Sequence, residues 1–125
     1  MSKYGNRKCK INGHCFDSVA ERNRYLILDS WRQAGEIKDL ELQPKFLLQD
    51  GFIYNGKSER AINYIADFKY VDTATNQTIV EDVKGVATPE YRLKRKLFLN
   101  LHGSNIVFKE IPANKIVWGK NCEKR

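Results

Sequence analysis

Two acidic residues and a lysine recur at strand-like spacing near the middle of this chain. Asp67 lies in the apolar and aromatic segment 64–70, and Asp82 and Lys84 lie in the β-branched segment 78–85. The polar residues 72–77 between them have the composition of a turn, so the segments are predicted to form a β-hairpin. Side chains alternate between the faces of a strand, so Asp82 and Lys84 share a face. If Asp67 reaches the same place, the three groups suit a divalent metal ion and a phosphate.

This combination matches the needs of phosphodiester hydrolysis. The reaction requires a nucleophilic water, relief of charge on the phosphate oxygens and stabilisation of the departing alkoxide, and metal ions provide all three. Mg²⁺ takes oxygen ligands and keeps several waters, so Asp67, Asp82 and the main-chain carbonyl of Val83 suffice to bind it. Lys84 would orient or help to deprotonate the attacking water, and Glu21 would complete the acidic cluster from an earlier helix.

A purely structural explanation of the same residues stays open. Exposed cross-strand ion pairs are common on sheets and contribute roughly a fraction of a kcal/mol, so spacing alone does not exclude one. Charge in strands otherwise rich in Ile, Val, Tyr and Phe is costly unless something pairs with it, which favours a site. Glu21 also completes a capping box with Ser18, so helix capping alone explains it on sequence chemistry.

Capping signals predict the helices that must carry these residues. A first helix is predicted to begin at Ser18 and to end at residues 34–35, because Gly35 readily adopts the left-handed conformation that ends helices. A second helix is predicted from Thr88, with Pro89 at its first position, to about residues 102–103. The apolar residues of this helix that are predicted to pack on the sheet are Leu93, Leu97, Phe98 and Leu101.

Turn signals divide the remaining sequence into short strands. Asn12-Gly13 predicts a basic N-terminal hairpin over about residues 3–16. Further segments are predicted as strands over 36–43, 45–49, 52–54 and 105–111, a polar loop over 57–60 and a basic C-terminal tail over about 112–125. The order of elements predicts one domain, residues 1–125, with an α/β (α+β) fold in which a mixed β-sheet is flanked by the two helices.

The charge of the chain points to an anionic partner. The sequence contains 22 Lys and Arg against 15 Asp and Glu, for a net charge of +7. Nucleic acid is the first candidate, although charge does not separate DNA from RNA. The residues predicted to contact the DNA backbone are Arg7, Lys8, Lys10, Tyr91, Arg92, Lys94 and Arg95. The alternative is that these charges only keep an edge strand and a helix face solvated.

Neither a run of about 18 apolar residues nor a secretory signal is found, so no membrane association is expected and a cytoplasmic location is predicted. Cys9, Cys15 and Cys122 are an odd number of cysteines, which argues against a disulfide framework and favours reduced thiols. Cys9, His14 and Cys15 lie close together, but no second pair of ligands follows at zinc-finger spacing, which argues against a zinc site.

Five sequence blocks in order along the chain carry a resemblance to a known family. They are Phe16-Asp17-Ser18, Gly35-Glu36-Ile37-Lys38-Asp39-Leu40, Gln43-Pro44-Lys45-Phe46, Tyr64-Ile65-Ala66-Asp67-Phe68 and Val80-Glu81-Asp82-Val83-Lys84-Gly85. These blocks resemble the small phage and prophage proteins of the DUF1064 family, over nearly the whole chain from Asn6 to Ile111. The pattern of Asp67 followed by Asp82-Val83-Lys84 also resembles the PD-(D/E)XK nuclease superfamily.

The resemblance implies a restriction-endonuclease-like core, dependence on Mg²⁺ or Mn²⁺, DNA as the substrate, and a role in phage recombination or replication similar to that of Holliday junction resolvases. By position in the motif, Asp67 is the first aspartate, Asp82 the second acid, Lys84 the lysine and Glu21 the helical glutamate.

The chain departs from the superfamily motif at two positions. Ala66 replaces the proline of the motif, which is tolerated because proline is no ligand. Glu81 beside Asp82 leaves the second metal-binding acid ambiguous. The alternation of side chains with Lys84 favours Asp82, whereas a β-bulge would favour Glu81.

These observations predict a metal-dependent DNA endonuclease, in the cytoplasm of a bacterial host if the chain is phage-encoded. The resemblance implies branched or junction DNA as a substrate, whereas the residues themselves leave the preference for a DNA structure open. A homodimer is the simplest assembly for two cuts on opposed strands, because it provides two symmetric sites. The alternative is a catalytically inactive protein with the nuclease fold that binds DNA or serves as an adaptor.

Overall fold

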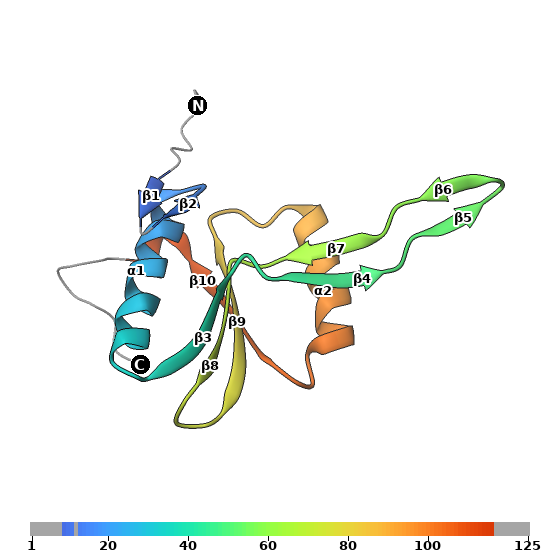
Figure 1. Cartoon of the computed structure of the whole chain (residues 1–125). Coiled ribbons are helices and arrows are strands. Elements are labelled where there is room, and N and C mark those ends of the chain that lie inside the picture. The colour runs from blue at the N-terminus through green and yellow to red at the C-terminus, as the bar shows by residue number, and fades with distance from the viewer. Residues whose placement is uncertain (1–8, 12, 117–125) are drawn as a thin grey trace.

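The hairpin predicted from residues 64–85 lies at the centre of a four-stranded mixed sheet (Figure 1). The computed structural model describes residues 9–11 and 13–116 of the chain. β9 (Gln77–Lys84) pairs antiparallel with β8 (Phe68–Asp72) and parallel with β10 (Val107–Pro112), and β3 (Ile37–Leu42) pairs with β8 at the opposite edge. The parallel pair needs a crossover, which α2 (Pro89–His102) supplies.

Both helices begin where their capping sequences predict. α1 (Val19–Gln33) is capped by Ser18, whose Oγ accepts a hydrogen bond from the Glu21 amide at 3.1 Å. The chain leaves this helix through Gly35, which has a φ of 80°. α2 is capped in the same way by the hydroxyl of Thr88. In the described part of the chain, neither helix is long and apolar enough to cross a bilayer.

Successive residues of β9 face different helices. Ile79 is buried in a cluster with Tyr25 and Leu28 of α1, and Val80 is buried in a second cluster with Tyr91 and Phe98 of α2. Because side chains alternate along a strand, α1 covers one face of the sheet and α2 covers the other (Figure 1). The predicted mixed sheet between two helices, in an α+β arrangement, is confirmed.

A long two-stranded ribbon leaves the sheet and projects from the body (Figure 1). It consists of the pair β4 (Lys45–Gln49) and β7 (Ile62–Ile65) followed by the pair β5 (Phe52–Tyr54) and β6 (Lys57–Glu59). We refer to residues 45–65 as the arm and to residues 50–60 as its tip. The base of the arm packs on α2, since the Phe46 and Tyr64 rings lie 4.7 and 5.0 Å from the Phe98 ring between centroids.

Two predictions in this region are wrong. Residues 64–70 do not form one strand, because the chain bends at residues 66–67, opposite a matching bend at residues 43–44. Gln43 has a φ of 52° and Pro44 has no amide hydrogen, so a regular ladder cannot continue through them. Residues 57–60 are not a polar loop, because β6 pairs with β5. Its side chains are exposed, so a polar composition does not oppose the strand.

The two termini of the described chain also refine the predictions. The N-terminal hairpin is confirmed as β1 (Cys9–Ile11) paired with β2 (His14–Phe16), while residues 3–8 of the predicted span lie outside the described residues. The predicted strand over 105–111 is confirmed as β10, and residues 117–125 of the predicted basic tail lie outside the described residues. β10 includes Pro112, and a 3₁₀ helix follows at Ala113–Lys115.

The prediction that all four apolar residues of α2 pack on the sheet is wrong for its leucines. Phe98 is fully buried, whereas Leu93, Leu97 and Leu101 are 60%, 37% and 49% exposed. Neighbouring helical residues are about 100° apart, so a helix that turns Phe98 to the sheet turns Leu97 toward its flank. We refer to Leu93, Leu97 and Leu101 as the leucine stripe.

A buried ion pair ties α1 to the centre of the sheet. Arg24 donates two parallel hydrogen bonds to the Glu81 carboxylate, from Nε to Oε1 at 2.7 Å and from Nη2 to Oε2 at 2.8 Å. The Tyr70 hydroxyl donates a third, and the Arg24 guanidinium lies 5.1 Å from the Trp31 ring centroid. Glu81 is fully buried, so its charge depends on these donors.

Replacing Arg24 by Met is expected to destabilise the fold by about 3–5 kcal/mol, because it leaves the Glu81 carboxylate buried without its cation. The free energy of unfolding in denaturant at neutral pH measures this loss. Arg32→Met is the matched control, since Arg32 pairs with Asp29 at 2.8 Å but is half exposed. The control should lose less than about 1 kcal/mol, and equal losses in the two variants would contradict the buried pair's role.

Candidate active site

The bend between β7 and β8 places Asp67 beside β9. The Asp67 amide donates to the Glu81 carbonyl at 3.1 Å, and the Val83 amide donates to Asp67 Oδ2 at 2.6 Å. Main-chain contacts therefore hold the Asp67 carboxyl group at the edge of β9. Because the amide and carbonyl of one strand residue point to the same side, the Val83 carbonyl is directed to this side as well.

Asp82 and Lys84 lie on the face of β9 that α2 covers. Asp82 is 2% exposed. Its Oδ1 lies 3.1 Å from Lys84 Nζ, and its Oδ2 accepts a hydrogen bond from the Tyr64 hydroxyl. Lys84 Nζ also lies 4.0 Å from the centroid of the Tyr91 ring. The ammonium group is thus held between a carboxylate and the face of an aromatic ring.

Glu21 reaches the cluster from the first turn of α1. Its carboxylate accepts hydrogen bonds from the Asp17 amide and from the Gln43 side chain. It also repels the carboxylates of Asp82 and Asp67. The capping role of Glu21 and its place in the acidic cluster are therefore compatible, since its amide serves the helix cap while its side chain faces the other two acids.

Burial raises the pKa of all three carboxyl groups. Desolvation, followed by repulsion from Asp82 and Glu21, raises the pKa of Asp67 to about 7, against the opposing effects of the Val83 amide and Lys84. The pKa of Glu21 and that of Asp82 are raised by desolvation as well. Lys84 opposes this rise for Asp67 and for Asp82, so one lysine offsets two of the three acids and the cluster carries surplus negative charge when all three ionise.

The register of β9 decides between Asp82 and Glu81 as the second acid. The β8–β9 ladder runs without a register shift from the pair Phe68 and Glu81 to the pair Asp72 and Gln77. Glu81 therefore faces α1, where Arg24 binds its carboxylate. The bulge that would bring Glu81 into the site does not form, and Asp82 is the acid that lies beside Lys84.

The donor set of the cluster fits a hard divalent cation that keeps part of its water shell. Within residues 13–116, no three Asp, Glu, His or Cys side chains gather into a preformed cage for one ion. Mg²⁺ ordinarily takes one or two carboxylates and fills its other positions with water and substrate oxygens. Asp67, Asp82 and the Val83 carbonyl supply such a set, and a cation there would offset the surplus negative charge.

Two surface depressions adjoin the cluster and share Tyr91 as a wall. The first, of about 340 Å³, lies against Asp82 and Lys84, and its other lining residues are Asn63, Tyr64, Ile65, Thr88, Glu90 and Lys94. The second, of about 550 Å³, is lined mainly by α2, through Arg92, Arg95, Lys96 and Leu99, together with Ala87 ahead of the helix and Glu110 of β10. An anionic chain that passes over the cluster would meet cations of α2 on both sides of Tyr91.

Three of the predicted DNA contacts lie beyond the description of the structure. Arg7 and Lys8 precede the described residues, and Lys10 is described only as part of the β1 backbone. Contact of these three residues with DNA therefore stays a prediction.

The contacts predicted on α2 divide into three kinds. Tyr91 is 8% exposed, its hydroxyl donates to Glu110 and its ring lies under Lys84 Nζ, so it supports the lysine, while its predicted contact with DNA stays a prediction. Lys94 and Arg95 pair with Glu90 and Glu110, each at 3.2 Å, and would exchange these partners for a ligand. Arg92 is exposed on the rim of the larger depression.

The whole sequence was compared with known protein families. The model of the family described as "Protein of unknown function (DUF1064)" matches residues 1–122. The chain belongs to this family. No curated protein and no solved structure matches it. The DUF1064 description assigns no activity, so the function must be argued from the geometry of the site.

In this DUF1064 protein, sequence reasoning missed Tyr64 and Glu110 as parts of the site. In the sequence, Tyr64 is one aromatic residue of an apolar segment and gives no sign of a polar role. The bend after β7 brings its hydroxyl to Asp82. Glu110 comes from β10, whose parallel register places it opposite Asp82.

Replacing Asp67 by Asn is expected to stabilise the metal-free protein at pH 8 by about 1–3 kcal/mol. The folded-state pKa of about 7 lies above the ordinary value of 3.8, so the protein loses stability as pH rises from about 3.8 to about 7, where the unfolded chain releases this proton and the folded chain still holds it. The amide has no such ionisation, and its oxygen can still accept from Val83. Unfolding in denaturant with a chelator, at pH 5 and pH 8, measures the difference.

Asp39→Asn is the matched control, because Asp39 is exposed on β3 and its φ of 57° suits asparagine. The control should show no gain in stability between the two pH values. A loss of stability in Asp67→Asn at pH 8 would contradict the repulsion described for the cluster.

Proposed function

We propose that this protein is a metal-dependent DNA endonuclease of the PD-(D/E)XK type, with a restriction-endonuclease-like core. The observation that carries the proposal is the convergence of Asp67, Asp82 and Lys84 on one side of the β8–β9 hairpin, with Glu21 completing the acids. The groups come from the first turn of α1, from the bend before β8 and from the end of β9. A surface ion pair explains neither their burial nor their surplus of negative charge.

The cofactor in this proposal is Mg²⁺ or Mn²⁺. Asp67, Asp82 and the Val83 carbonyl would hold it, with Glu21 close by. When bound, the ion would neutralise phosphate charge and favour the ionised form of a water molecule. The chain keeps both aspartates in place without it, through the Val83 amide on Asp67 and the Tyr64 hydroxyl on Asp82. Burial and the carboxylate of Asp82 raise the pKa of Tyr64, so its hydroxyl remains a donor.

Lys84 is the group placed to act on the substrate. Its Nζ is 3.1 Å from Asp82 Oδ1 and borders the smaller depression, where a scissile phosphate would lie. From there the ammonium group can orient an attacking water and offset charge that develops on the phosphate. Tyr91 restricts the lysine to this position, because its ring packs under Nζ while its own hydroxyl is anchored on Glu110.

DNA is the proposed substrate because the protein is basic and its cations border the site. The net charge is +7, and Arg92, Arg95 and Lys96 line the larger depression. Such cations bind the sugar-phosphate backbone without regard to sequence. Branched or junction DNA in phage recombination or replication is the substrate that the family resemblance favours, and RNA is the alternative with the same charge.

One observation favours a second candidate, an inactive protein of this fold that binds DNA or serves as an adaptor. Both oxygens of Asp82 already have partners within the chain, Lys84 and Tyr64. A metal ion would have to share or displace one of them. The two candidates differ in turnover, so a cleavage assay separates them.

Asp82→Asn is expected to abolish cleavage, with a loss of roughly a hundredfold or more, while DNA binding stays within a fewfold of the parent. The substitution keeps the shape of the side chain but removes the charge that a cation requires. The assay incubates each protein with Mg²⁺ or Mn²⁺ and a panel of linear, flapped and four-way-junction DNAs, with an RNA duplex in parallel.

Asp39→Asn serves again as the control and should cut as the parent does. Equal cleavage by Asp82→Asn and the parent would refute the assigned site. Binding of the panel by the parent without any product would favour the inactive binding protein.

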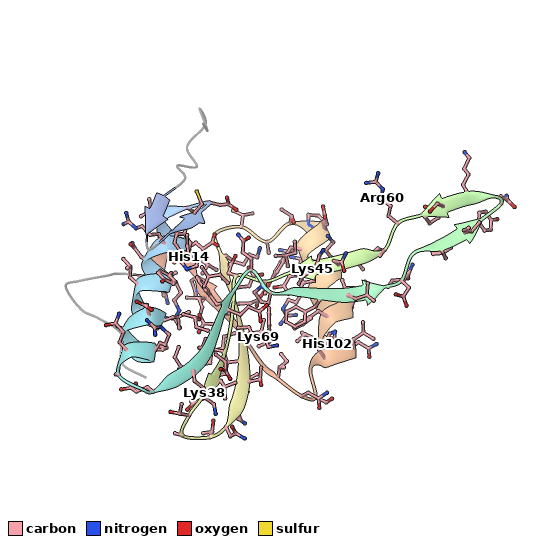
Figure 2. The ribbon with its side chains drawn as sticks, viewed as in Figure 1. His14, Lys38, Lys45, Arg60, Lys69 and His102 are labelled. Atoms are coloured by element: carbon pink, nitrogen blue, oxygen red, sulfur yellow. The ribbon has the colours of Figure 1, made fainter. Side chains whose placement is uncertain are left out.

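Arg92→Ala is expected to weaken binding of every DNA in the panel by a similar factor and to reduce the slope of log K against log salt by roughly 1, because one phosphate contact is lost. Fluorescence anisotropy across a salt series measures both quantities. Lys38→Ala is the matched control, since Lys38 is an exposed lysine of β3 far from α2 (Figure 2). An identical slope change in both variants would show that only net charge matters.

A further inference from the structure

Gln43 has a backbone conformation that its residue type disfavours. Its φ of 52° lies in the left-handed region, which residues other than glycine, asparagine and aspartate rarely adopt. The next residue is a proline, which restricts Gln43 toward extended conformations as well. Strained residues persist where the surrounding structure fixes them, and they are frequent at functional sites. Glycine would relieve this strain, so the glutamine side chain itself is expected to have a role.

The main chain of Gln43 fixes the bend that carries Asp67. The Gln43 amide donates to the Asp67 carbonyl at 2.9 Å, and the Ala66 amide donates to the Pro44 carbonyl at 3.1 Å. The Pro44 side chain is fully buried, so the turn out of β3 is anchored in the interior. Figure 1 shows the chain passing from β3 into the arm beside the point where it returns from β7 into β8. Gln43 is therefore adjacent to the first aspartate of the candidate site.

The side chain of Gln43 binds a different acid. It donates a hydrogen bond to the Glu21 carboxylate, which also accepts from the Asp17 amide. Asp17 lies ahead of α1 on the same segment as Glu21, whereas Gln43 belongs to the bend. The hydrogen bond from Gln43 thus connects the helical acid to the segment that carries Asp67. Gln43 is exposed, so its carboxamide lies at the rim of the acidic cluster.

A neutral donor is well suited to hold Glu21 in this cluster. The Glu21 carboxylate is repelled by Asp82, and it repels Asp67 in turn, so without a donor it would turn away from both. A lysine or arginine in place of Gln43 would cancel part of the negative charge that attracts a cation. A carboxamide donates a hydrogen bond and carries no charge. Donors of this kind, behind the acids that face a metal ion, orient those acids in many metal sites.

We propose that Gln43 is a positioning residue of the metal site, and that its carboxamide holds Glu21 where that carboxylate helps to bind the cation. The inference rests on the proposed function, because the cation is the one proposed to bind Asp67 and Asp82. It adds that Glu21 contributes to the affinity for the cation only while Gln43 orients it.

The strained backbone contributes to this role. The Asp67 carbonyl and the buried Pro44 hold the main chain of Gln43 on both sides. The side chain therefore starts from a fixed point, and less conformational freedom is lost when its amide binds Glu21.

The first test measures Mn²⁺ binding in the absence of DNA, from the electron paramagnetic resonance signal of the unbound ion. Gln43→Met keeps the length of the side chain and removes its donor, and it is expected to weaken Mn²⁺ binding roughly tenfold or more. Gln43→Gly removes the side chain together with the strain, and it should weaken binding by a similar factor. Parent affinity in either variant would overturn the proposal, because the bend alone would then suffice.

Gln49→Met and Asn76→Gly are the matched controls for the two substitutions. Gln49 is an exposed glutamine of β4, and Asn76 is an exposed residue with a φ of 61° in the turn before β9, at the opposite end of that strand from Asp82. Both controls should bind Mn²⁺ as the parent does. Circular dichroism in the presence of a chelator checks that each variant is folded.

The second test asks whether Gln43 acts through Glu21. Glu21→Ala removes the acceptor of the hydrogen bond and keeps the amide that binds Ser18. In this background, adding Gln43→Met should change the affinity for Mn²⁺ by less than about twofold. A further loss of roughly tenfold in the double variant would show that Gln43 acts on the ion independently of Glu21, and it would overturn the proposal.

Cleavage provides a third readout. With limiting Mn²⁺, Gln43→Met is expected to lower kcat while the KM for DNA stays within about twofold of the parent, and excess Mn²⁺ should restore most of the rate. A raised KM with an unchanged kcat would assign the exposed carboxamide to DNA binding instead.

Failure of this inference and failure of the proposed function would look different. A parent that binds no Mn²⁺ would refute the proposed metal site and this inference with it. Mn²⁺ binding that Gln43→Met leaves unchanged would overturn this inference alone. The first two tests do not require cleavage, so a protein that binds Mn²⁺ without cutting DNA would still decide the role of Gln43.

Discussion

The candidate site depends on one contact, between the bent chain at Asp67 and the edge of β9. The Asp67 amide donates to the Glu81 carbonyl, and the Asp67 carboxylate accepts from the Val83 amide. One residue therefore fixes both the point where the ribbon leaves the sheet and the position of an acidic group. A straight strand would have carried Asp67 past this edge. The bend therefore links the architecture to the chemistry, because the same two residues of β9 that continue the sheet also set the position of the first carboxylate.

Glu81 and Asp82, adjacent residues of β9, lie in different electrostatic environments. Glu81 is fully buried and compensated by two hydrogen bonds from Arg24, so it behaves as a structural charge. Asp82, on the other face, shares Lys84 with Asp67, and burial raises the pKa of these two acids and of Glu21. A sheet between two helices provides both environments within one strand, since alternation sends one acid to each side.

The sequence was sufficient for the features that local chemistry controls. Ser18 and Thr88 cap the two helices through their own side chains, so their sequence context is enough to predict them. The turn after β8 closes the hairpin whose second strand carries Asp82 and Lys84 on one face. It was insufficient where a distant segment decides. The break at residues 66–67 is invisible in an apolar run and follows from Gln43 and Pro44 across the ribbon, and the exposure of the α2 leucines follows from which helix face meets the sheet.

The continuity of the ribbon from the tip of the arm to Asp67 limits how homologous chains can vary in length. One residue added to β7 would turn Tyr64 to the opposite face and withdraw its hydroxyl from Asp82, whereas added residues at the Asn55-Gly56 turn would only lengthen the projecting end. Insertions and deletions are therefore expected to be confined to that turn, with the span from Ile62 to Asp67 kept constant.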